Sequence, residues 1–248
     1  MAFEIQELSF SGILDTSFRL VRDHFLLLVG ICAVTDFPMQ VAVNFFEAST
    51  FPRADVLLVA LLVFPPVSLF VAAVLTFAVG ELYLGRPVSI TQAYRQALGI
   101  FLGLAGTIVL ADLAVICGLL LLLVPGIYLL GAFILVNPVV IFERKLGTRA
   151  LGRSRELMAG NFLRAGGILL VSGVLNWTAG IALSVALGFA PWLEVLFQGA
   201  TASVVSAFAA TALVILYFDI RCRKEGFDLE HLGRLVESGQ APAVVPIA

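Results

Sequence analysis

Long apolar runs alternate with short polar stretches along this 248-residue chain. A bilayer core about 30 Å thick takes roughly 20 apolar residues per membrane-spanning helix, and six runs come close to that length. They cover residues 25–46, 56–82, 100–124, 127–142, 162–189 and 196–218. The pattern predicts an all-α, polytopic integral membrane protein with six transmembrane helices.

The third and fourth runs are separated by a turn signal rather than by a polar segment. Between residues 100 and 142 the chain has one ionisable residue, Asp112. As a single helix this stretch would be about 64 Å long, twice the bilayer core. Pro125 and Gly126 lie near its middle and favour a turn, so we expect a tight helical hairpin there.

The polar stretches on one side of the spans have the periodicity of amphipathic helices. In the first, Leu14, Phe18, Val21 and Phe25 recur at helical spacing. Residues 90–98 and 148–160 form the second and third, and in the third Leu151, Leu157 and Met158 make up the apolar face. Such helices are typical of the headgroup region of a membrane.

These segments also indicate an internal repeat. Aligning them brings Phe25, Phe101 and Phe162 into register, so each unit is an interfacial helix followed by two spans. The sequence therefore predicts three hairpin repeats in a single membrane domain, residues 1–238, which includes a C-terminal amphipathic segment. Residues 239–248 are expected to be a short disordered tail.

Composition and charge agree with a membrane protein. Hydrophobic residues make up 60% of the chain and charged residues 13%, about half the share in a soluble domain. Fourteen of the fifteen Lys and Arg residues fall on one side of the predicted spans, and Arg53 alone falls on the other. The positive-inside bias places both termini in the cytoplasm. A net charge of −2 offers no field for nucleic acid.

Two aspartates lie within predicted spans, where a charged group is energetically unfavourable. The repeat aligns Asp36 with Asp112, each about 16 Å beyond its aligned phenylalanine and near mid-membrane. One interpretation is a proton or cation site with Asn44, Asn137 and Asn176 as further polar ligands. The other is that each aspartate is neutral and hydrogen-bonds a neighbouring helix as a structural contact.

The basic residues beside the spans are candidates for binding lipid. We expect anionic headgroups to contact six of them. They are Arg149, Arg153, Arg155, Arg221, Arg223 and Lys224. Asp219, beside two of these arginines, is expected to form an ion pair at the membrane surface.

The sequence has no recognisable catalytic constellation. The two histidines, His24 and His231, lie outside the spans, and neither a HExxH nor a GxSxG motif occurs. We therefore predict a protein that is not an enzyme, with no cofactor and no metal.

Two stretches carry a family resemblance. They are LLLVPGIYLLGAFILVNPVVIFE with ALGRSRELMAGNF, and ALVILYFDIRCRKEGFDLEHL. They resemble bacterial multi-pass proteins related to the membrane domain of glycerophosphodiester phosphodiesterases. The resemblance implies this fold and a bacterial inner membrane, but no activity, because that family's phosphodiesterase is a separate soluble barrel that nothing here matches.

Two functions follow as hypotheses. The first is a non-enzymatic inner-membrane component that organises lipid or a partner through its basic cytoplasmic face, the partner being another protein or a second copy of this chain. The alternative is a small proton- or cation-coupled transporter or channel that uses Asp36 and Asp112.

Overall fold

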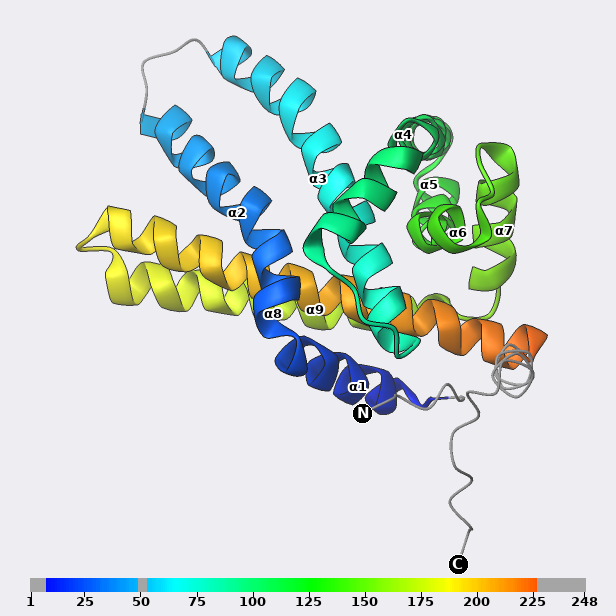
Figure 1. Cartoon of the computed structure of the whole chain (residues 1–248). Helices are drawn as coiled ribbons and strands as arrows, with labels where there is room; N and C mark the ends of the chain where they lie inside the picture. The colour runs from blue at the N-terminus through cyan, green and yellow to red at the C-terminus, as the bar shows by residue number, and fades with distance from the viewer. Residues whose placement is uncertain (1–7, 49–52, 227–248) are drawn as a thin grey trace, which may run out of the picture.

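The computed structural model describes residues 8–48 and 53–226, and over those ranges the chain forms nine helices and no strand (Figure 1). They are α1 (Phe10–Asp23), α2 (Phe25–Ala48), α3 (Arg53–Tyr83), α4 (Ile90–Leu121), α5 (Leu123–Ala132), α6 (Val136–Glu143), α7 (Thr148–Met158), α8 (Phe162–Leu187) and α9 (Pro191–Glu225). The predicted all-helical fold is confirmed.

Five helical segments in the described ranges are long and apolar enough to cross a membrane. They are Pro65–Tyr83, Ile90–Leu121, Leu123–Glu143, Phe162–Leu187 and Trp192–Glu225. The remaining predicted span, residues 25–46, lies within α2, of which the stretch Phe25–Met39 is apolar. The chain is therefore a multi-pass helical protein by length and composition, and the sixth span stays a prediction.

The hairpin between α4 and α5 is present, but its turn is three residues earlier than predicted. The helices meet at Leu122, which has an extended backbone. Pro125 lies in the first turn of α5, where a missing N–H costs no helical hydrogen bond. A Cβ on Gly126 would lie 2.3 Å from Cδ2 of Leu119, so this glycine allows the two helices to approach closely instead of forming the turn.

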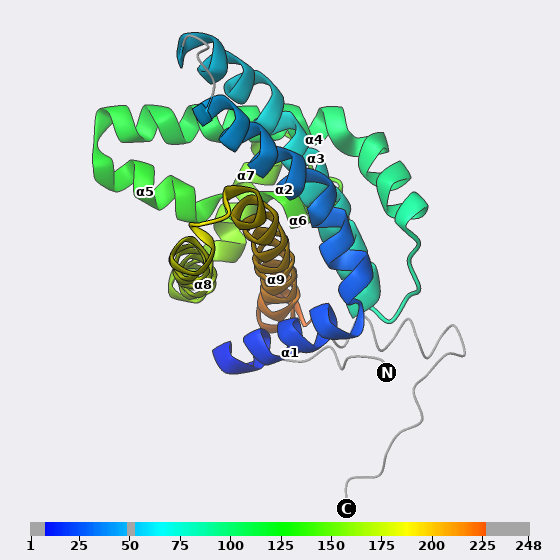
Figure 2. The same cartoon turned by 90° about the vertical axis from the view of Figure 1, so that its left-hand side faces the viewer.

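The predicted amphipathic helices are found, with two corrections. In α7, Leu151, Leu157 and Met158 are buried as expected. In α1 the buried residues are Ile13, Ser17, Leu20 and Val21, and this face packs against α9. Phe18, which was predicted to belong to the packed face, is exposed. The segment at residues 90–98 is not a separate helix but the beginning of α4, which Figure 2 shows bending along its length.

Three helical hairpins diverge from a common end of the molecule. In Figure 1 the α2–α3 and α8–α9 hairpins extend to the left, and Figure 2 shows the α4–α5 hairpin running crosswise to α8 and α9. Their common end, which we call the polar base, consists of α7, the C-terminal ends of α3, α6 and α9, and the residues just before α1. A short separate helix precedes the α2–α3 hairpin and the α8–α9 hairpin, namely α1 and α7. Before the α4–α5 hairpin, the corresponding segment is continuous with α4. The threefold repeat therefore stays a prediction. The predicted C-terminal amphipathic segment and tail lie outside the described residues.

Candidate functional site: the polar base

Aromatic side chains form the apolar layer beneath the polar base. Tyr83, Tyr217 and Phe218 are almost completely buried. Phe218 stacks on Tyr83 with ring centroids 5.5 Å apart and contacts Phe142 at 5.2 Å. A Cβ on Gly80 would lie 2.1 Å from the Phe142 ring, so α3 must have glycine at this position for the ring to pack here. This layer joins α3, α6 and α9 by direct ring contacts.

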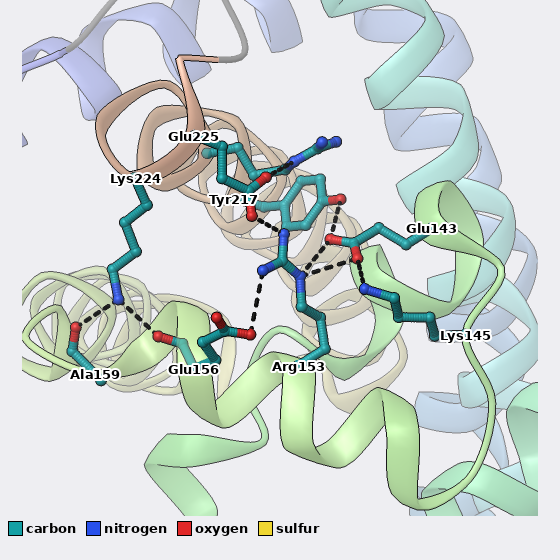
Figure 3. A network of polar contacts seen from close by, with 9 residues as sticks. Glu143, Lys145, Arg153, Glu156, Ala159, Tyr217, Lys224 and Glu225 are labelled. Carbon is teal, nitrogen blue, oxygen red and sulfur yellow. Dashed lines mark hydrogen bonds and ion pairs between the residues drawn. The ribbon is translucent and has the colours of Figure 1, made fainter.

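Arg153 joins three helices above that layer (Figure 3). It projects from α7, and its Nε donates to the Glu143 carboxylate at the end of α6, at 2.9 and 3.0 Å. Its other nitrogens donate to Glu225 on α9 and, at 3.3 Å, to Glu156 on its own helix. Glu143 also accepts from Lys145 at 2.7 Å and from the Tyr217 hydroxyl at 3.2 Å.

The guanidinium of Arg153 is an internal group although it belongs to a surface helix. Its side chain is 13% exposed. Burial by itself would lower the pKa of Arg153, but hydrogen bonds from the guanidinium to Glu225 and Glu143 outweigh it and hold the pKa above its usual value. The cation is therefore permanent, and it stabilises two carboxylates from different helices at once.

The C-terminal end of α9 is fastened to α7 by a second cation. The Lys224 ammonium donates to the carbonyl oxygens of Glu156, at 2.6 Å, and Ala159, at 2.9 Å (Figure 3). These lie at the C-terminal end of α7, where carbonyl groups lack helical partners and a cation is favourable. Arg221 donates to Glu225 one turn further along α9, at 2.8 Å.

A buried carboxylate ties the beginning of the described chain to α9. Asp219 accepts from the Leu8 backbone N–H at 2.6 Å, from Arg164 at 2.8 Å and from Arg223 at 3.1 Å. Arg223 also donates to the Leu8 carbonyl at 2.7 Å. The expected ion pair of Asp219 is confirmed, with Arg223 and Arg164 as its partners, whereas Arg221 binds Glu225.

The six predicted headgroup-binding residues fall into two groups. Arg153, Arg221, Arg223 and Lys224 are held by internal partners. Arg149 is exposed and forms no ion pair with any described residue. Arg155 is exposed and has a neutral partner, the Tyr128 hydroxyl at 3.3 Å, with its guanidinium 5.8 Å from the ring centre.

The candidate intramembrane residues are not brought into one site among the described residues. The side chains of Asp36 and Asn44 lie outside the described part of the structure. Asp112 is exposed on α4, with no hydrogen bond or ion pair to a described residue. Asn137 is on α6, where its buried Oδ1 accepts no hydrogen bond, and Asn176 lines a groove between α8 and α9 that neither of the others reaches.

Glu143, Tyr217 and Glu225 were not predicted, although part of their signal is visible in the sequence. The four-residue spacings of Asp219 with Arg223 and of Arg221 with Glu225 are those of helical ion pairs. The LYFDIRCRKE string contributes the residues that α9 supplies to the polar base: Tyr217, Asp219, Arg221, Arg223, Lys224 and Glu225. No spacing could have shown that Arg153 reaches Glu225, because 72 residues separate them.

Within the described ranges, the polar base pairs its carboxylates, although some of its arginines have no acidic partner. Its carboxylates each contact a cation, and among residues 8–48 and 53–226 no group of three His, Cys, Asp or Glu side chains could hold a metal ion. No family model, curated protein or solved structure matches the chain. Function must therefore be argued from the exposed charges and surfaces alone.

Proposed function

We propose that this chain is a multi-pass protein of the bacterial inner membrane that organises anionic lipid at the cytoplasmic face, with no enzymatic step. Lipid is held by the arginines that the polar base leaves without an acidic partner. Four such arginines are exposed among the described residues: Arg95, Arg144, Arg149 and Arg155. The proposal rests on one observation. Some of the cations are paired with groups inside the protein, and others, which we call the open arginines, are exposed and have no acidic partner.

The position of the open arginines supports a lipid ligand. Arg144 directly follows the span that ends at Glu143, and α7 with Arg149 and Arg155 connects that span to the next one. Cations at span ends lie at the depth of lipid phosphates. The exposed apolar side chains of the hairpins supply the matching acyl-chain contacts; Trp177 and Trp192, 70% and 66% exposed, both lie in the outer half of the α8–α9 hairpin, where an aromatic belt is expected.

The test compares two pairs of exposed arginines, one on α7 without acidic partners and one on α1 with them. Arg149→Gln with Arg155→Gln removes two open cations, each worth about 1 kcal/mol near an anionic surface, so affinity for phosphatidylglycerol should fall about thirtyfold. Arg19→Gln with Arg22→Gln removes two exposed cations that Asp15 and Asp23 already neutralise, and should change little. Phospholipid retained by the protein in mild detergent, measured by native mass spectrometry, gives the comparison. Equal retention by both double variants and the parent protein would refute the proposal.

A further inference from the structure

A pocket of about 440 Å³ lies at the rim of the polar base, between the ends of α3, α6 and α9. Its position is defined by the spans that form it. One of those spans ends at Tyr83 and another at Glu143, and both ends lie beside the pocket. A ligand in this pocket would therefore lie at the depth of lipid headgroups.

The lining of the pocket changes from aromatic to charged side chains along α3 and α9, toward the C-terminal end of each helix. Phe77 on α3 lies one helical turn before Glu81, and Phe218 on α9 lies about one turn before Arg221, so the aromatic side chains are on the bilayer side of the charged ones. Arg86 and Arg144 complete the charged rim. This order matches a phospholipid, whose apolar part enters the membrane and whose headgroup stays at its surface.

Glu81 is an incompletely neutralised carboxylate in this rim. Its side chain is 17% exposed, and among the described residues its charged partner is Arg86, 3.6 Å away. That distance is too long for a hydrogen bond, and the Arg86 side chain is itself mostly exposed. Glu143, by contrast, accepts from Lys145, Arg153 and Tyr217. Glu81 therefore has lone pairs available for a cationic ligand.

Arg144 is the open cation of the same pocket. It is exposed, contacts no acidic group in the described ranges, and has φ of 55°, the one non-glycine residue there with a positive φ. This left-handed conformation favours glycine or asparagine over arginine. Arg144 is the C-cap of α6, and the left-handed conformation ends that helix beside the pocket.

We propose that this pocket binds the headgroup of an amine-bearing phospholipid, of the phosphatidylethanolamine type. The phosphate contacts Arg144 and Arg86, the ammonium contacts Glu81, and the glycerol and first acyl carbons lie on Phe77, which is partly exposed. An anionic lipid without an amine leaves Glu81 unpaired in the rim, so the pocket discriminates against it. The inference rests on the proposed function and adds a second lipid class at a site that shares Arg144 with the open arginines.

The experiment measures lipid retention by the full chain with defined lipids. Purified, delipidated protein receives phosphatidylethanolamine or phosphatidylglycerol, and bound lipid is counted by native mass spectrometry. Glu81→Gln and Arg144→Gly each remove one charge-assisted contact and should lower retention of phosphatidylethanolamine about tenfold. Arg144→Gly also relieves the left-handed backbone, so the variant is expected to fold. Arg19→Gln, an exposed arginine that Asp15 already neutralises and that lies outside the pocket, is the control and should leave phosphatidylethanolamine retention unchanged.

The outcomes separate this inference from the proposed function. Phosphatidylethanolamine retained equally by the parent protein, Glu81→Gln and Arg144→Gly would overturn the pocket, even when phosphatidylglycerol still depends on Arg149 and Arg155. Failure of both lipids to bind would overturn both proposals. Displacement of the bound lipid by soluble phosphoethanolamine at equal concentration would show that the ligand is a free phosphate ester and would also overturn the lipid assignment.

Discussion

The polar base and the hairpins that extend from it are stabilised in opposite ways. In the polar base, α6, α7 and α9 are joined by hydrogen bonds between charged groups over an aromatic layer, and Arg153 alone contacts three carboxylates. In the hairpins burial is uneven: 50% of the α9 span is buried by the rest of the chain, but only 28% of the α4 span and 11% of the α8 span. The chain itself therefore determines the geometry of the polar base, whereas the uncovered parts of the hairpins require a surrounding bilayer.

Among these predictions, removing the Arg153 guanidinium should have the largest effect on stability. Arg153→Ala leaves Glu143 and Glu225 without their shared cation. We expect a loss of about 3 kcal/mol in the free energy of unfolding, the low end of the range for a broken buried pair, because Glu225 keeps some contact with solvent. Thermal unfolding in detergent measures it. Arg149→Ala, on the same helix but without an ion-pair partner, is the control; an equal loss in both variants would show that the network does not stabilise the polar base.

A charge on a hairpin should be the next most damaging change. Leu170 is 68% exposed in the middle of α8, so in a water-soluble protein Leu170→Lys would be harmless. Inside a bilayer a lysine near the helix centre costs about 2.5 kcal/mol or more, and the fraction of protein integrated into the membrane should fall. Resistance to alkaline extraction reports integration. Ile90→Lys, at the first residue of α4, should integrate normally, and normal integration of Leu170→Lys would contradict a lipid-facing α8.

The smallest effect is expected at Asp112. Its side chain is exposed on the α4 span and contacts no described residue, so Asp112→Asn breaks no protein contact, and membrane integration, measured by resistance to alkaline extraction, should stay normal or improve slightly because an ionisable group is costly on a lipid-facing helix. Under the transport hypothesis the same variant stays folded but loses proton-linked flux in liposomes. Proton flux in the parent protein that disappears in Asp112→Asn would replace the lipid-organising account with that hypothesis.

The sequence predicted the helical elements well and the polar base only in part. Helical periodicity and apolar length are local properties, so the beginnings of α2 at Phe25 and of α8 at Phe162 could be recognised. The turn at Leu122 could not, because Pro125 fits equally well into a turn or the first residues of a helix. Local patterns also could not show the partners of Arg153, which the charge pattern predicted to bind lipid headgroups. Its burial depends on Glu143 and Glu225, which only the fold brings near it.

The most direct test of the central claim is to determine on which side of the membrane the polar base and the hairpin ends lie. In a chain whose native cysteines are replaced by alanine, single cysteines are introduced at Leu122 and Phe189, at exposed hairpin ends, and at Gly152 on the outer face of α7. We predict that a membrane-impermeant thiol reagent labels Leu122→Cys and Phe189→Cys in intact cells, and labels Gly152→Cys only after the membrane is opened. Labelling of Gly152→Cys from outside, or protection of both hairpin ends, would contradict an account in which spanning hairpins extend from a cytoplasmic polar base.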